Sequence, residues 1–251
     1  MLEHTLIIFN RQIRLSLRTP LWAIIALIQP LLYLVLFAPL LQPLANRPGF
    51  PAGDAWTVFV PGLLVQLGMF GSLFVGFGLL DAMRNGVVER MRVTPVSRLA
   101  LLLGRVLRDA LVLIIQATIL TLAAVAMGLR VPATGALVAV VIVGLLGVAL
   151  SSLSYAAALR LRSEDSLAQL LNSVSLPVLL LSGILLPMTL APRWLRLLAG
   201  FNPFYYVVDG TRAAFRGDTG ATELIVGLAA AALLAAAGLW VGVRTFQRES
   251  A

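Results

Sequence analysis

The sequence contains no cysteine, no lysine and a single histidine, His4. Without cysteine the chain can form no disulfide, thiolate metal site or cysteine nucleophile. One histidine at the N-terminus also excludes a histidine-based triad and a multi-histidine metal site. The absence of lysine excludes a standard P-loop, because that loop needs a lysine to reach the β- and γ-phosphates of a nucleotide. We therefore expect no ATPase site, metal site or bound cofactor in this chain.

Charged residues are also scarce at 12%, whereas hydrophobic residues make up 60% of the 251 positions. Soluble domains have an apolar share of about 45–50%, and the mean hydropathy here is +0.97. The net charge of +8 comes from arginines in short connections between apolar runs. That placement is typical of topology determinants and not of nucleic-acid binding. The composition predicts an all-α, multi-pass membrane protein.

Six apolar windows are long enough to cross a bilayer, whose core of about 30 Å requires about 20 residues of helix. When both termini are placed in the cytoplasm, the inner connections hold more arginine than the outer ones. The positive-inside rule favours that orientation. We predict one transmembrane domain over residues 1–251, with spans at 21–41, 57–80, 105–127, 135–159, 168–187 and 222–243.

An amphipathic helix is predicted before the first span, at residues 5–19. Leu6, Phe9, Ile13 and Leu17 recur there at helical spacing, and the arginines fall on other faces. Such a pattern is typical of a helix that lies on the membrane surface.

The longest inner connection contains the charged segment RNGVVERMRVTPVSR, residues 84–98. Glu89, Arg90 and Arg92 present charge, and Thr94-Pro95 ends the helix because a proline disfavours helical geometry in the residue before it. We expect a short charged helix that offers a contact for a cytoplasmic partner.

The last outer connection is unusually polar and aromatic for a loop between spans. Residues 188–217 combine proline breaks with short amphipathic pieces, which predicts one or two short helices dipping into the outer leaflet, since non-helical backbone at membrane depth needs protein or water around it. Asn202 and Pro203 are expected to start one helix as cap and first-turn residue. Asp209 and Arg212 are spaced to meet on one face of that helix. The aromatic residues expected at headgroup level are Trp194, Phe204, Tyr205 and Tyr206.

Three amides within the predicted spans are candidates for the lining of a polar path: Gln66, Gln169 and Asn172. Lipid penalises such groups, so they are expected to face protein or water. Hydrogen bonding between helices is the alternative explanation for them.

The inner run NGVVERMRVTPVSRLALLLGR and the outer run SGILLPMTLAPRWLRLLAGFNPFYYVVDGTRAAFRG resemble the membrane subunit of a type-2 ABC exporter. The similarity extends over essentially the whole chain and is closest to the daunorubicin-resistance type of drug-export permease. It implies six spans, a surface helix, a cytoplasmic coupling helix and re-entrant helices before the last span. It also implies a bacterial plasma-membrane permease, paired with an identical or similar subunit, that moves a drug, antibiotic or lipid-like compound outward by alternating access.

The resemblance further implies separate ATPase subunits that bind ATP and Mg²⁺. It assigns the coupling helix to Gly86, Glu89, Arg90, Arg92, Pro95 and Arg98, and the outer gate to Trp194, Asn202, Pro203, Tyr205, Tyr206, Asp209 and Arg212. Three alternatives stay open: export of a lipid or lipid-linked glycan, a secondary transporter or channel, and an intramembrane enzyme. The last is disfavoured because the spans hold no histidine, no Gly-x-Ser-x-Gly and no aspartate pair.

Overall fold

The computed structural model describes residues 2–18, 21–45, 54–86, 97–185, 187–218 and 220–249. Every regular element within these ranges is a helix, so the predicted all-α class is confirmed for them. The elements are α1 Leu2–Arg18, α2 Leu21–Ala45, α3 Ala55–Leu73, α4 Val75–Arg84, α6 Arg98–Ala126, α7 Ala133–Leu161, α8 Glu164–Leu181, η1 Met188–Leu190, α9 Arg193–Ala199, α10 Pro203–Arg216 and α11 Thr222–Glu249.

Four helical stretches within these ranges are long and apolar enough to cross a membrane: Ala55–Arg84, Leu99–Ala126, Ala133–Leu161 and Thr222–Arg248. They correspond to four of the predicted spans and support a multi-pass membrane protein. A shorter apolar stretch, Ile24–Phe37, lies in α2. The stretch 57–80, predicted as a single helix, is two helices end to end, because α3 ends and α4 begins at Phe74. The count of six spans stays a prediction.

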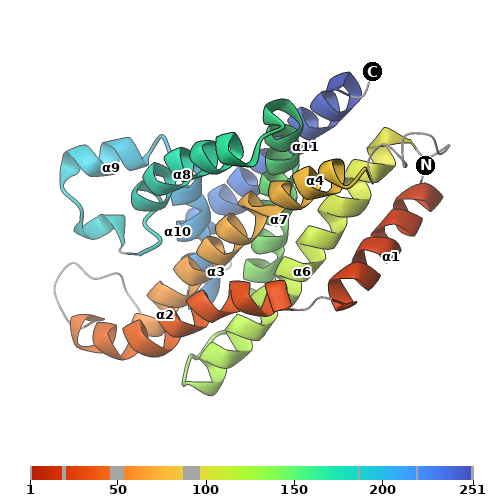
Figure 1. Ribbon diagram of the computed structural model, residues 1–251. Coiled ribbons are helices and arrows are strands. Elements are labelled where there is room, and N and C mark those ends of the chain that lie inside the picture. Colours follow the sequence, from red (N-terminus) through yellow and green to blue (C-terminus); the bar gives the residue numbers. More distant parts are fainter. Residues whose placement is uncertain are drawn as a thin grey trace.

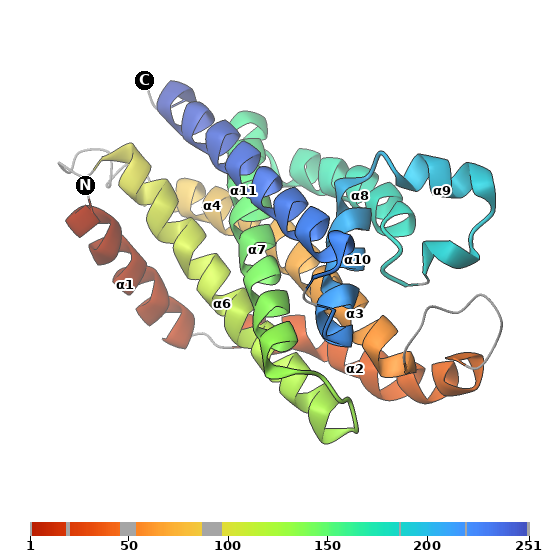
Figure 2. The ribbon, with the colours of Figure 1, turned by 180° about the vertical axis from the view of Figure 1, so that it is seen from behind.

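Helix α7 is the centre of the bundle and packs against α3, α4, α6, α10 and α11. Figure 2 shows it between α6 and α11, and in Figure 1 α3 and α4 cross in front of it. Small residues allow close approach in these contacts, since a Cβ on Gly238 of α11 would lie 2.4 Å from the Ala149 carbonyl oxygen. Along α11, Ala231 and Ala235 are buried while Leu233 is exposed. One side of the alanine-rich run at residues 227–238 is therefore a close-packing face.

Helix α1 lies along the first half of α6, and the figures show the two side by side (Figures 1 and 2). Ile8 contacts α6 at Gly104, where a Cβ would come within 2.7 Å of the isoleucine side chain. The buried face is completed by Thr5 and Gln12. The predicted apolar face points elsewhere, because Leu6 and Leu17 are exposed and remain available to lipid.

Both termini lie at one end of the bundle, beside the end of α4 and the start of α6 (Figure 1). The α9 helix lies far from them in both views (Figures 1 and 2). The end of α4 and the start of α6 therefore lie at a different end of the molecule from α9.

Candidate functional site

The candidate site is built around the α9–α10 segment, residues 187–218, which follows α8. Its longest helix, α10, is amphipathic and packs against α3, α7 and α11. The close approach to α11 occurs at Gly210, where a Cβ would lie 2.8 Å from the Gly227 Cα. The segment is thus fastened to the bundle by α10, while α9 projects from it (Figure 1).

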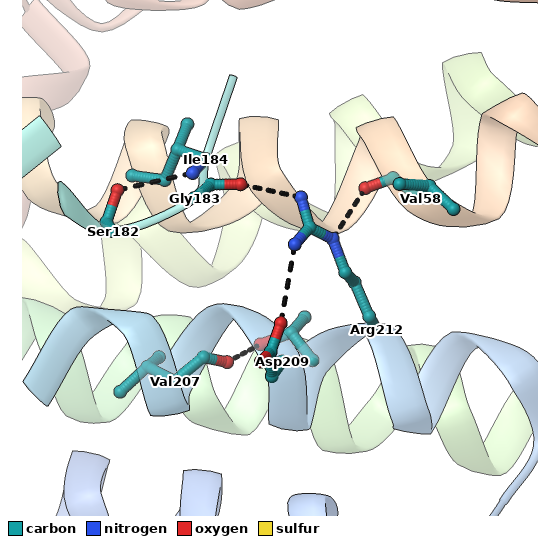
Figure 3. A network of polar contacts seen from close by, with 8 residues as sticks. Val58, Ser182, Gly183, Ile184, Val207, Asp209 and Arg212 are labelled. Carbon is teal, nitrogen blue, oxygen red and sulfur yellow. Dashed lines mark hydrogen bonds and ion pairs between the residues drawn. The ribbon is translucent and has the colours of Figure 1, made fainter. Parts of the chain in front are cut away.

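Arg212 of α10 is the central polar residue of this segment, and its side chain reaches three elements (Figure 3). Its Nε donates to the Val58 carbonyl of α3 at 3.0 Å and its Nη2 donates to the Gly183 carbonyl after α8 at 2.7 Å. Its Nη1 pairs with Asp209 Oδ1 at 3.4 Å. The guanidinium is a planar fork of donors, which lets one cation join three acceptors. The Arg212 side chain therefore bonds α10 to α3 and to the end of α8.

The environment of Arg212 makes these contacts necessary. The residue is only 3% exposed, and a buried charge without hydrogen-bond partners is strongly destabilising. Burial lowers the pKa of Arg212, and the neighbouring Asp209 carboxylate opposes that shift. Asp209 itself keeps a third of its side chain exposed. The ion pair therefore joins a buried guanidinium to a partly exposed carboxylate.

The Gly183 carbonyl is presented to Arg212 by a tight corner after α8. Gly183 has a φ of +74°, a left-handed conformation that favours glycine. Ser182 fixes the corner, because its hydroxyl donates to the Leu179 carbonyl at 2.7 Å and accepts from the Ile184 amide at 3.3 Å. The corner also presses on α3, since a Cβ on Gly62 would lie 2.3 Å from the Ile184 carbonyl oxygen.

Asn202 starts α10 in the way the sequence predicts and makes a second contact that the sequence does not reveal. Its Oδ1 accepts from the Phe204 amide at 3.1 Å, with Pro203 in the first turn, so the predicted cap is confirmed. Its Nδ2 donates to the Val178 carbonyl of α8 at 2.8 Å. Val178 lies in the last turn of α8, where helix carbonyls lack partners within the helix. One buried amide thus joins the start of α10 to the end of α8.

The aromatic residues divide into two groups. The rings of Tyr205 and Tyr206 lie 5.2 Å apart at an edge-to-face angle, and the Tyr206 hydroxyl donates to the Gly200 carbonyl at 2.9 Å. Burial and the neighbouring Asp209 carboxylate raise the pKa of Tyr205 to about 12. Trp194 lies on α9, is largely exposed and makes no contact with Arg212, whereas Phe204 is buried in the core, so the expected place of Phe204 at headgroup level is wrong.

Two adjoining hollows open beside Arg212. The first encloses about 160 Å³ and the second about 220 Å³, and both are bordered by Tyr205, Asp209 and Glu223. Arg212 and Arg216 line the first, while Tyr206 lines the second. Charges of both signs lie next to aromatic rings here, but each hollow is smaller than a typical ligand pocket of about 300–1,000 Å³. Among the residues that the structure describes, no group of three or more His, Asp or Glu side chains is placed to hold a metal ion.

Of the predicted coupling residues, the structure describes only Gly86 and Arg98, which lie at the end of α4 and the start of α6. Gly86 follows α4 with a φ of +65°, and Arg98 begins α6. Glu89, Arg90, Arg92 and Pro95 lie outside the described residues. The two helices that flank the segment are well defined, and Arg84 at the end of α4 pairs with Glu164 at the start of α8 at 2.8 Å.

The three predicted path residues do not come together. Gln66 is buried in the bundle, and its Oε1 has no hydrogen-bond partner among the described residues. Gln169 and Asn172 lie exposed on α8. The amides therefore face two different environments, an inner one for Gln66 and the surface of α8 for the others.

Comparisons with known proteins agree with the resemblance read from the sequence. The family described as ABC-2 type transporter matches residues 3–215. The chain is 29% identical to the putative transport permease ycf38 of Cyanophora paradoxa over 78% of this chain and 68% of that protein. It is 29% identical to the ycf38 permease of Porphyra purpurea over 83% and 73% of the two chains. It is 21% identical to the daunorubicin resistance ABC transporter permease protein DrrB1 of Streptomyces coeruleorubidus over 92% and 82%.

Proposed function

Because the chain belongs to the ABC-2 type transporter family, as the membrane subunit of an ABC system, we propose that it exports a hydrophobic or amphipathic compound by alternating access. The energy comes from separate ATPase subunits that bind ATP and Mg²⁺. The absence of lysine supports this division of labour, because the permease itself lacks a standard P-loop. The proposed location is the bacterial plasma membrane, with both termini in the cytoplasm.

The observation that carries the proposal is the set of bonds made by Arg212. A buried cation in the α9–α10 segment joins three elements, and two of its three partners are backbone carbonyls. Backbone carbonyls occur all along these elements, so such bonds can be exchanged for others when helices slide. This set of bonds acts as a closed lock of the outer gate, and its release opens the exit.

The chemistry of the residues that line the hollows beside Arg212, and not the size of these hollows, supports an amphipathic cargo. Their charged lining, with Asp209, Arg216 and Glu223, offers partners to a polar head, and Tyr206 offers an aromatic face. The relative DrrB1 is named for daunorubicin resistance, which makes a drug-like amphiphile the first cargo to test. Lipid or lipid-linked glycan export is the alternative outcome.

Helix α8 supports pairing with a second permease. Its surface combines the exposed amides Gln169 and Asn172 with the exposed apolar residues Leu176 and Leu180. In lipid an uncovered amide is unfavourable, whereas at a subunit boundary or a wet path it is stabilised. The second subunit is identical or similar in sequence and completes the cargo path along α8.

The test is transport in inside-out proteoliposomes that hold the chain with its ATPase subunit. We expect daunorubicin to accumulate with Mg-ATP, not to accumulate with ADP, and to do so unchanged when the proton gradient is collapsed. Accumulation that needs the proton gradient and ignores ATP would instead indicate a secondary transporter. If daunorubicin is inert but lipids stimulate ATP hydrolysis, the cargo is a lipid and the drug assignment is wrong.

A further inference from the structure

Two adjacent residues of α7, Ser154 and Tyr155, make polar contacts with three other helices. Both are buried, at 1% and 2% exposure. Successive residues of a helix point about 100° apart, so each side chain faces its own neighbour. Ser154 reaches the junction of α3 and α4, and Tyr155 reaches α6.

Ser154 holds the break between α3 and α4. Its Oγ accepts from the Gly76 amide at 3.0 Å and donates to the Leu73 carbonyl, so one hydroxyl bonds to both sides of the break. The approach is close, because a Cβ on Gly76 would lie 2.7 Å from that hydroxyl and 2.8 Å from the Ser154 carbonyl oxygen. Helix α4 cannot shift along α7 without losing this contact.

Tyr155 holds α6 through a buried carboxylate. Its hydroxyl donates to Asp109 Oδ2 at 2.6 Å, and Arg108 Nη1 pairs with Asp109 Oδ1 at 2.6 Å. Arg105 places its guanidinium 6.0 Å from the Tyr155 ring centre. A carboxylate within a spanning helix is costly and is kept where it serves a function. Here it is fully engaged by its neighbours, so it joins α6 to α7 and is not free to bind cargo.

The contacts of Ser154 and Tyr155 connect to the Arg212 bonds through α7. Helix α4 precedes the segment 84–98 and α6 follows it. Both helices that flank this segment are therefore bonded to adjacent residues of α7. At its other end α7 touches α10, where a Cβ on Gly135 would lie 2.0 Å from the Ala214 carbonyl oxygen. Ala214 is two residues from Arg212. A continuous packed path therefore runs from α4 and α6, the helices on either side of residues 87–96, through α7 to the Arg212 bonds.

We infer that Ser154 and Tyr155 are positioning residues that transmit movement of the segment 84–98 through α7 to the α9–α10 segment. The inference rests on the proposed function, because it requires an ATPase that moves the segment. Ser154 and Tyr155 touch neither nucleotide nor cargo. Their hydroxyls make α4, α6 and α7 move as one body, so that displacement at one end reaches Ala214 at the other.

The experiment uses the absence of cysteine to place one reporter thiol at each end. Met83→Cys reports on the end of α4, and Ile184→Cys reports on the corner bonded to Arg212. Each is introduced separately into the complex of the chain with its ATPase in lipid nanodiscs, and the maleimide labelling rate is compared in ATP and in ADP. The test variant is Ser154→Ala combined with Tyr155→Phe, which removes the two hydroxyls and little volume.

The expected result is that ATP alters labelling of both reporters in the parent chain, and only of Met83→Cys in the double variant. Ser152→Ala is the matched control, because that buried hydroxyl bonds within α7, to the Val148 carbonyl, and should leave both responses intact. An unchanged response at Ile184→Cys in the double variant overturns the inference and leaves the proposed function standing. Loss of both responses indicates a purely structural role and also overturns it. If ATP alters neither reporter in the parent chain, the proposed function itself fails.

Discussion

Replacing Arg212 with methionine tests whether this side chain locks the α9–α10 segment. Methionine preserves much of the apolar volume, but it removes the donors to the Val58 and Gly183 carbonyls, which lie 3.0 and 2.7 Å away. Hydrogen bonds to a charged group contribute about 1.5–3 kcal/mol each, so their joint loss costs about 3–6 kcal/mol. The contact with Asp209 adds little, because at 3.4 Å it is long and its acid is partly exposed.

The predicted consequence is easier opening of the corner that holds Gly183. Each 1.4 kcal/mol corresponds to a tenfold change in an equilibrium, so a loss of about 3 kcal/mol raises the open population by about 100-fold. The reporter is Ile184→Cys, a position only 1% exposed in a chain without other thiols. Its maleimide labelling rate should rise by about 100-fold if labelling requires local opening.

The matched control is Arg216→Met on the same helix. Arg216 pairs with Asp218 at 3.0 Å, but the two side chains are 27% and 54% exposed, and ion pairs open to solvent contribute about 0–1 kcal/mol. Its effect on labelling should therefore stay below about fivefold. If Arg212→Met changes the labelling rate no more than Arg216→Met does, Arg212 is not a lock and the gate argument is wrong.

Three further predictions concern the same region and are measured by thermal unfolding in detergent. Gly62→Ala should lower the free energy of unfolding by about 1–3 kcal/mol or more, because its Cβ would lie 2.3 Å from a backbone oxygen. Gly78→Ala, which has nothing within 4 Å, should be neutral or gain up to about 1 kcal/mol of helix propensity; equal effects of the two would contradict the close packing. Asn202→Ala should cost about 2 kcal/mol through loss of the cap and of the bond to α8, and Asn202→Asp about half, since it keeps the cap. An Asn202→Asp variant as stable as the parent chain would refute the second bond, because this variant loses the donor to Val178 and keeps the capping oxygen. Since the folded state raises the pKa of Tyr205 to about 12, from about 10 in the unfolded chain, its contribution to stability is present below pH about 10 and is lost as the pH rises to about 12. Tyr205→Phe should remove that part of the alkaline loss, and an identical pH profile in the two proteins would refute it.

Hydropathy and spacing predicted the features that depend on local sequence. Long apolar runs predict the helices α7 and α11, and an Asn-Pro pair predicts the start of α10. The i,i+3 spacing brings Asp209 and Arg212 together. Each of these features requires information from only a few neighbouring residues.

The remaining features depend on tertiary contacts that a single sequence does not encode visibly. Arg212 bonds to two backbone carbonyls, and every residue carries a carbonyl, so no residue type identifies the acceptors. The break at Phe74 contains no proline and is bridged by Ser154, which lies about eighty positions further along the chain. Helix α1 packs through a face that includes the polar residues Thr5 and Gln12, so apolar spacing favoured another face.

Co-purification is the most direct test of the central claim that a separate ATPase drives this permease. The chain is tagged, extracted in mild detergent and examined for a bound ABC ATPase that hydrolyses ATP, with the ratio of the two subunits measured. We expect an ATPase at equal ratio, and its loss when Glu89 and Arg90 in the segment 84–98 are both changed to alanine, while the matched change of Arg193 and Arg196 on α9 leaves it bound. A permease that purifies without any ATPase and still transports its cargo would contradict the account.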